Sequence, residues 1–288
     1  MAVGARYAQK HHGLKKVCIF DWDVHVGDGT SQIFYDDESV LYMSIHRFDN
    51  GIFYPGPAGK HTKTGEGKGR GYNVHFPFNV EKTMKTIIGD HDFIYACETI
   101  FFPIMREFEP ELIIVSAGFD SALGDPLGQI GVTPVGYAYM TQGFRSICPK
   151  IVVALEGGYD LHALSVSSEA VVNTLRVHPN DNQGIEKLFQ ELGCDEGTTM
   201  EQLRIRSMIH PRESFKQAAS KVAKALIKQW PFLEHLIVEK IRRKSSIMKS
   251  DQSSDDNSST FGSNISPGKR REVRSNSYQV EDPIEEIE

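Results

Sequence analysis

The chain has 288 residues, of which 40% are hydrophobic and 24% are charged, and its formal net charge is -6. This composition is that of a globular protein, and the acidic balance argues against direct nucleic-acid binding, which needs a basic surface. The four cysteines are far apart and form no C-x-x-C pair, so neither a disulfide framework nor a thiolate zinc site is expected. There is no secretory signal pattern, and no apolar run approaches about 18 residues, so we expect a nuclear or cytoplasmic protein without a membrane span.

Predicted strands and helices alternate along the first 178 residues. We expect strands at 17–23, 40–46, 72–78, 112–116 and 151–155, and helices at 1–14, 90–108, 135–148 and 163–177, with a helix-like stretch that reaches Tyr35. Two Gly- and Pro-rich loops, 48–71 and 121–134, interrupt the pattern, and loops of such length inside a compact domain are usually functional. The alternation predicts an α/β domain built on a mostly parallel sheet.

The pattern weakens after residue 180. Residues 213–230 have apolar side chains at helical spacing, which predicts an amphipathic helix that docks on the domain or, alternatively, binds a partner. We expect 179–244 to be a helical extension packed on the domain. Composition predicts a disordered tail at 245–288, rich in Ser and acidic at its end. The basic patch in that tail, 269–271, is either a nuclear localisation signal or solvated charge.

Potential metal ligands gather where two of the predicted strands end. Asp21, Asp23 and His25 are spaced by two, which in an extended strand places them on one face. Asp120 follows the predicted strand 112–116. Carboxylates and an imidazole at the carboxyl ends of parallel strands indicate a metal-dependent hydrolase.

Four segments in series resemble the zinc-dependent histone deacetylase family, specifically its class II branch. They are 21–25 with 27–30, 41–47, 116–120 with 124–128, and 155–161. Because they keep the family's order and spacing, we expect 1–178 to be a partial deacetylase-like domain. The resemblance implies an arginase/deacetylase-like three-layer fold, with its N-terminal part missing, and hydrolysis of acetyl-lysine amides on histones or other proteins.

The resemblance also assigns the central residues of the site. It implies that Asp23, His25 and Asp120 hold Zn²⁺, and that Tyr159 is the catalytic tyrosine whose hydroxyl stabilises an oxyanion. Three protein ligands of N and O type leave a fourth position open, as catalytic zinc requires. Gly158 would let the backbone turn sharply enough to aim the tyrosine ring.

Further positions are implied by the same resemblance. Asp21 and Asp28 match carboxylates that orient a pair of catalytic histidines, and Asp21 with Ser44 matches a structural K⁺ site. Tyr54 lies where the family usually has a Phe in the wall of the acyl-lysine tunnel. Leu127 is apolar where polyamine-selective members have a Glu, which favours acetyl-lysine in a protein. Four residues match a second K⁺ site through backbone oxygens: Phe34, Asp37, Val40 and Tyr72.

The chain departs from the family in two places. The family's catalytic His-His pair lies upstream of 21–25, on a segment that we expect this chain to lack, because 2–16 resembles the helix just before that strand. His11 and His12 are interpreted as a solvated helix end rather than as a replacement pair. Val26 stands where the family normally has a second His, so we expect altered surroundings of the zinc rather than lost binding. Missing strands would also leave an exposed sheet edge.

Three interpretations of the function follow. The first is zinc-dependent deacetylation of acetylated proteins, histone or tubulin-like, by the full-length form, with corepressor-type protein partners and a role in chromatin and transcription regulation. The second is a catalytically inactive zinc-binding scaffold that lacks the His-His base. The third is a ureohydrolase of arginase-like fold, which a single Asp-x-His plus Asp set disfavours because those enzymes use two metal ions.

Overall fold

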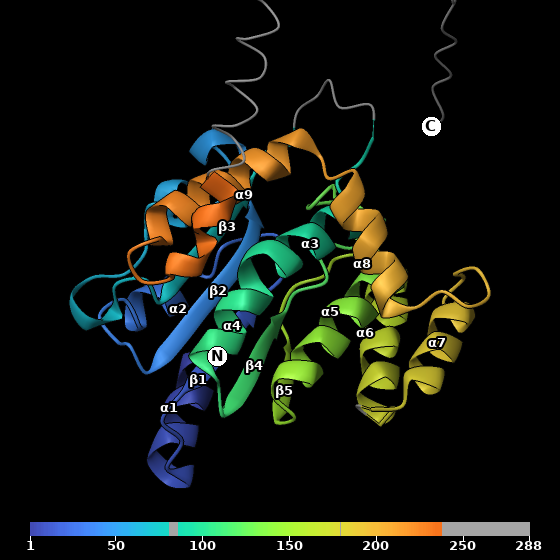
Figure 1. Cartoon of the computed structure of the whole chain (residues 1–288), viewed down its shortest axis with the longest axis horizontal. Helices are drawn as coiled ribbons and strands as arrows, with labels where there is room; N and C mark the ends of the chain where they lie inside the picture. The colour runs from blue at the N-terminus through green and yellow to red at the C-terminus, as the bar shows by residue number, and fades with distance from the viewer. Residues whose placement is uncertain (81–85, 179, 238–288) are drawn as a thin grey trace, which may run out of the picture. The chain divides into compact units, whose positions relative to one another are not determined.

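The computed structural model describes residues 1–80, 86–178 and 180–237. Its centre is a five-stranded sheet with the strand order β3-β2-β1-β4-β5, in which all four pairings are parallel (Figure 1). The strands are β1 (Val17–Asp21), β2 (Val40–Arg47), β3 (Asn73–Phe78), β4 (Leu112–Ala117) and β5 (Ile151–Leu155). The predicted α/β fold with a parallel sheet is therefore confirmed.

Helices precede the first strand, connect most of the others and follow the last of them. They are α1 (Ala2–His12), α2 (Asp28–Ile33), α3 (Asp90–Ala96), α4 (Phe102–Phe108), α5 (Pro134–Ile147), α6 (Leu161–Arg176), α7 (Asn182–Glu191), α8 (Met200–Ile209) and α9 (Glu213–Leu226). A π-helical segment, Cys97–Phe101, joins α3 to α4, so the predicted helix 90–108 is one helical stretch with a change of pitch. α7 and α8 lie within the range 179–244 predicted as a helical extension, for which no individual helix bounds are predicted before residue 213.

The sheet is the middle of three layers. Successive side chains of a strand point to opposite faces, and β1 is buried at all five positions. Its Cys18 and Phe20 belong to the larger core, together with residues of α3, α4, α5 and α9. Its Val17 and Ile19 face the other way, into a smaller core that includes Ala5 of α1. This arrangement confirms the predicted three-layer architecture.

The first strand is shorter than predicted, because it ends at Asp21 and not at residue 23. Asp21 Oδ1 accepts the amide of Asp23 at 3.2 Å, and Asp23 Oδ1 accepts the amide of His25 at 2.7 Å. Such bonds between side chains and nearby amides replace the strand ladder with turns. The prediction that Asp21, Asp23 and His25 share one strand face was therefore wrong. The loop after β1, rather than the strand's pleat, orients the latter two.

The ends of the first helix agree with the sequence prediction. α1 stops at His12, and Gly13 follows with φ 69°, a backbone conformation that favours glycine. His11 and His12 are exposed at this helix end, and the His11 ring stacks on Tyr7 with a centroid distance of 4.4 Å. The interpretation of the two histidines as a helix terminus is confirmed.

The amphipathic helix predicted after residue 212 docks on the sheet. α9 packs against β3, where the Phe215 ring lies 5.5 Å from that of Phe76 and 5.6 Å from that of Phe78, between centroids. Phe215 is fully buried. The helix ends at Leu226, four residues earlier than predicted.

The two edges of the sheet differ in their exposure. β3 is covered by α9, whereas β5 pairs only with β4 among the described strands. Val152 is 50% exposed and Leu155 is 60% exposed on β5. β5 is thus an edge strand that carries exposed apolar side chains. The predicted link between an exposed edge and missing N-terminal strands stays a prediction.

Some predictions fall outside the described residues or concern membranes. The predicted tail at 245–288, with its basic patch, lies outside the described part of the chain. The proposed division of the chain at residue 178 stays a prediction. Among the described helices, none has the length and apolar character needed to cross a bilayer.

Loss of the Phe215 ring should destabilise the domain. Phe215→Ala is expected to lower the free energy of unfolding by about 3–5 kcal/mol, because it removes transfer energy and leaves a cavity against β3. Lys224→Ala, at an exposed position of the same helix, should change it by less than about 0.5 kcal/mol. Chemical denaturation followed by circular dichroism measures both variants. Equal losses would show that α9 is not docked as described.

A charge on the exposed edge should reduce self-association. Val152→Lys is expected to shift the chain toward monomer in sedimentation velocity over a range of concentrations, because an edge lysine opposes pairing between sheet edges. Val172→Lys makes the same chemical change at a 54% exposed position on α6. If the two variants behave alike, net charge and not the β5 edge governs association.

Candidate metal centre

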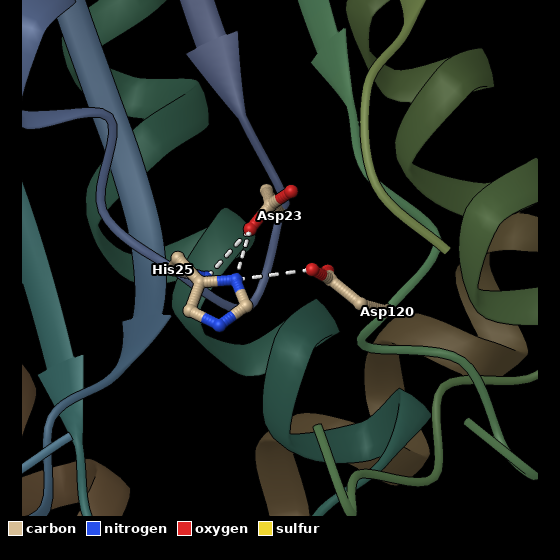
Figure 2. Close-up of side chains that lie close together, drawn as sticks. All are labelled: Asp23, His25 and Asp120. Carbon is tan, nitrogen blue, oxygen red and sulfur yellow. Dashed lines mark hydrogen bonds and ion pairs between the residues drawn. The ribbon is translucent and has the colours of Figure 1, made fainter. Parts of the chain in front are cut away.

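The candidate site lies at the carboxyl ends of β1 and β4, which are neighbours in the sheet. Asp23 and His25 come from the loop after β1, and Asp120 comes from the loop after β4 (Figure 2). In parallel strands that lie side by side, the following loops emerge at the same edge of the sheet, where ligands of open α/β sheets bind. Residues 95 positions apart in the chain thereby come into contact.

The three side chains converge on a single point. His25 Nδ1 lies 2.9 Å from Asp23 Oδ1 and 3.1 Å from Asp120 Oδ2, as Figure 2 shows. The three potential ligand atoms all lie within 4.8 Å of one another. Two carboxylate oxygens and one imidazole nitrogen form a donor set that suits zinc. The residues that the sequence assigned to the metal are thus the ones that the fold brings together.

The electrostatics of the cluster favour a bound cation. Asp120 is fully buried, and burial together with the charge of Asp23 raises its pKa. The hydrogen bonds with Asp120 and Asp23 raise the pKa of His25 to about 9. Two carboxylates this close repel each other unless a positive charge lies between them. A proton on His25 would supply that charge, and a metal ion at the same point would supply it more fully.

Backbone hydrogen bonds hold the ligands in place. Asp120 Oδ1 accepts the amide of Val24 at 2.8 Å, which ties the loop after β4 to the loop after β1. The other carboxylate oxygen, Oδ2, remains directed at His25. Asp23 Oδ1 accepts the amide of His25, as described above. Each carboxylate is therefore oriented by the backbone before any ion binds.

Gly118 and Gly157 have no side chain, which leaves room for the carboxylates of Asp23 and Asp120. A Cβ atom on Gly118 would lie 2.2 Å from Asp23 Oδ2, and one on Gly157 would lie 2.8 Å from an oxygen of both Asp23 and Asp120. Any side chain at these positions would displace the ligands. Gly157 is therefore required by close approach, whereas Gly158, with φ 123°, provides the sharp turn that the sequence predicts.

Asp21 is buried beside the cluster but does not join it. Its Oδ2 accepts the hydroxyl of Tyr42 at 2.8 Å, and the same hydroxyl accepts the amide of Gly27 at 2.9 Å. Burial, followed by the charge of Asp23, raises the pKa of Asp21. Asp21 therefore connects β2 and the loop before α2 to the floor of the site.

Ser44 and Asp28, the other two residues predicted to support the site, lie apart from the three converging side chains. Ser44 is the register partner of Asp21 across β1 and β2, and its Oγ lies 2.9 Å from His46 Nδ1. Burial lowers the pKa of His46 to about 4, which marks it as a neutral core histidine. Asp28 is the first residue of α2, and its carboxylate accepts the amide of Gly29. Neither Ser44 nor Asp28 belongs to the group of converging ligand atoms.

The carboxylate of Asp125 holds the backbone of both Tyr159 and Leu127 through hydrogen bonds. Asp125 Oδ2 accepts the amide of Tyr159 at 2.7 Å. Asp125 Oδ1 accepts the amides of Leu127 and Gly128. The loop after β4 and the loop after β5 are therefore fixed relative to each other at the rim of the site.

The cluster opens into a hollow of about 420 Å³. Its lining includes His25, Val26, Tyr54, Leu127 and Tyr159, so the residues predicted for the metal, the tunnel wall and the catalytic tyrosine meet there. Tyr159 is 56% exposed and Leu127 is 49% exposed. Among the described residues that line the hollow, His25 is the only histidine.

Sequence reasoning missed four residues that shape the site. The Phe53 ring stacks on the His25 ring with a centroid distance of 5.1 Å, and Glu156 is among the residues that line the hollow. Tyr42 and Asp125 make the hydrogen bonds described above. Asp125 had a detectable signal, because Asp before Pro in a Gly-rich segment often bonds nearby amides. Tyr42 also had a detectable signal, because its hydroxyl is a polar group within a mostly apolar strand.

Comparisons with known proteins agree with this geometry. Residues 1–175 match the family model described as "Histone deacetylase domain". The chain is 45% identical over 178 residues to histone deacetylase 6 of Caenorhabditis elegans, a match that covers 61% of this chain and 18% of that protein. It is 45% identical over 183 residues to histone deacetylase 15 of Arabidopsis thaliana, covering 63% and 32% respectively. It is 42% identical over 190 residues to histone deacetylase 7 of Homo sapiens, covering 64% and 20%.

Solved structures resemble the fold as well. A crystal structure of the HD domain of HDA15 matches with a TM-score of 0.67 and 36% identity, over 84% of this chain and 58% of that chain. The structure of the histone deacetylase Clr3 matches with a TM-score of 0.61 and 35% identity, over 78% and 34%. The matched part amounts to between 18% and 32% of the three curated relatives named above. From the family match and the site that it contains, we conclude that the chain belongs to the histone deacetylase family, on the class II side that its motifs indicate.

Proposed function

We propose that this chain carries the metal-binding half of a zinc-dependent deacetylase site, and that the whole protein hydrolyses acetyl-lysine amides on histones or other proteins. The observation that carries the proposal is the convergence of Asp23, His25 and Asp120 in one hollow with Tyr159. Membership of the histone deacetylase family supports the reaction class.

The donor set fits zinc in the role that the family gives it. Asp23, His25 and Asp120 would hold the ion, and the open hollow beside them leaves room for a further ligand. When bound, zinc would polarise the amide carbonyl and lower the pKa of a bound water. A structural K⁺ beside Asp21 and Ser44 is part of the same proposal, supported by their adjacency across β1 and β2.

Tyr159 is suited to donate a hydrogen bond to the developing oxyanion. Its pKa is raised, by burial first and then by the negative charges of Asp120 and Asp23, so the hydroxyl keeps its proton at neutral pH. A donor positioned before the reaction stabilises charge that appears only in the transition state. Asp125 holds the backbone from which the Tyr159 ring extends.

The walls of the hollow suit the aliphatic chain of an acyl-lysine. Phe53, Tyr54 and Leu127 offer aromatic and apolar surface next to the metal ligands. An apolar Leu127 gives no anionic partner to a cationic polyamine, which favours a protein substrate. The proposal extends, on the family resemblance, to corepressor-type partners and to a nuclear or cytoplasmic location.

The lining of the hollow also favours a second candidate function. His25 is the only described histidine there and is itself a metal ligand, so no described imidazole is left to act as a general base. Positioned acid-base groups typically contribute about 10²–10⁴ in rate. The second candidate is therefore a zinc-binding, deacetylase-like scaffold with little turnover by the 288-residue chain itself.

The first test is turnover of an acetylated lysine peptide by the whole protein. Tyr159→Phe is expected to lower kcat by about 10²–10³, because one oxyanion donor is lost. Asp120→Ala should remove activity together with bound zinc. Tyr7→Phe removes a hydroxyl of equal exposure, 56%, on α1 and should leave turnover unchanged. Unchanged activity in both site variants would contradict the proposed reaction.

The second test is metal stoichiometry of the 288-residue chain. We expect one zinc per chain by elemental analysis after dialysis, and loss of that zinc in Asp120→Asn, because the fully buried ligand cannot be replaced by a neighbour. Asp36→Asn, at an exposed position, should retain it. Two ions per chain would instead indicate the arginase-like alternative. Zinc binding without peptide turnover supports the scaffold, and turnover near that of a complete homologue refutes it.

A further inference from the structure

A second hollow, of about 520 Å³, lies between the loop after β2 and helix α9. It shares no lining residue with the hollow of the metal centre. Segments more than 150 positions apart in the sequence form it, with Phe48 and Pro57 on one side and Ala218 on the other. Its volume lies within the range of about 300–1,000 Å³ that is usual for small-molecule sites.

Basic side chains from both segments meet at this hollow. Lys60 and His61 come from the loop, and Lys221 comes from the exposed face of α9. All three line the same hollow. The pKa of His61 is lowered, by burial first and then by the positive charges of Lys221 and Lys60. None of the described residues that line the hollow is acidic, although the chain as a whole carries a net charge of -6.

Two carboxylates that are next in sequence to lining residues, Asp49 and Glu213, have other partners. Asp49 accepts Arg47 Nε at 2.7 Å and the amide of Val80 at 2.7 Å. Glu213 lies 3.7 Å from Lys216 Nζ, measured from its carboxylate. The positive charge of Lys60 and Lys221 therefore has no carboxylate partner among the described contacts and is open to an anion from solution.

Neutral groups complete the lining. Ser214 Oγ, in the first turn of α9, is shielded from solvent and has no hydrogen-bond partner among the described residues. A buried polar group without a partner is costly, and a ligand acceptor would remove that cost. The rings of Phe48, Pro57 and Pro77 supply an apolar wall beside the basic one. The hollow thus combines a cationic side, a hydroxyl and an apolar side.

We propose that this hollow binds a phosphomonoester, with the phosphoryl group among Lys60, His61, Lys221 and Ser214, and with a ring or other apolar part of the ligand against the apolar wall. A phosphoryl dianion offers three acceptor oxygens, which matches several donors better than a carboxylate does. Charge-assisted hydrogen bonds of this kind are roughly twice as strong as neutral ones. The concave shape favours a small ester over an extended nucleic-acid backbone.

A bound ligand would also restrain the loop that reaches the metal centre. The carbonyl of Phe48 accepts the amides of Gly51 at 2.8 Å and Phe53 at 3.3 Å, and Phe53 stacks on His25. Phe48 and Pro57 flank this turn and both line the second hollow. Contact with the ligand should therefore slow the amide exchange of residues between them.

The test is calorimetric titration of the 288-residue chain with phenyl phosphate and with inorganic phosphate, at constant ionic strength. We expect saturable binding of both, tighter for phenyl phosphate because its ring reaches the apolar wall. Lys60→Gln and Lys221→Gln should each weaken binding by about tenfold, since each removes one charge-assisted contact. Lys224→Gln makes the same charge change at an exposed position of α9 outside the hollow and should leave affinity unchanged.

Three outcomes would overturn the proposal. One is the absence of saturable binding by the folded wild-type chain. Another is an equal loss of affinity in Lys224→Gln, which would show a diffuse charge effect. The third is hydrogen exchange that is unchanged by phenyl phosphate across 48–61 and the first turn of α9. A larger affinity for inorganic phosphate than for the ester would assign the site to a free ion and remove the role of the apolar wall.

Discussion

The structure depends on the approach of two carboxylates, Asp23 and Asp120, to one imidazole nitrogen of His25. Two carboxylates that approach the same nitrogen repel each other unless a cation lies between them. Burial of Asp120 strengthens this requirement, because burial disfavours the charged form of the carboxylate. The surrounding chain is organised to hold this unfavourable pair. Glycines stand where a side chain would displace the oxygens, and backbone amides orient each carboxylate. The metal ion proposed for this site would offset the repulsion between the two carboxylates.

The parallel sheet makes the approach possible. β1 and β4 are adjacent and in register, with Asp21 opposite Ser116, so their following loops start at the same height. Both strands are buried on two faces, which fixes them firmly between the helical layers. Two hydrogen bonds near these strand ends fix the surroundings of the cluster. The hydroxyl of Tyr42, on β2, donates to Asp21, and Asp125 accepts the amide of Tyr159. The rigid scaffold thus carries the reactive groups on short loops.

The loop after β2 links two parts of the surface. It presents Phe53 to the ring of His25 on the metal side, and its residues Phe48 and Pro57 line the separate basic hollow against α9. The docking of α9 through Phe215 is what closes that hollow. α9 therefore covers the edge strand β3 and also supplies Lys221 to the second candidate site.

The sequence by itself determined the parallel α/β fold, because apolar runs of strand length are directly visible, and its resemblance to a known family singled out Asp23, His25 and Asp120, which the fold brings together. It failed on the loop geometry: local hydrogen bonds end β1 at Asp21, and the carboxylate of Asp21 accepts the hydroxyl of Tyr42 instead of joining the cluster. Only the tertiary structure decided that Gly157 is needed for close approach and that Lys60 and Lys221 line the same hollow. The spacing of apolar residues shows which face of its own helix or strand a residue occupies. Contacts between segments far apart depend on strand order and helix docking, which no local pattern contains.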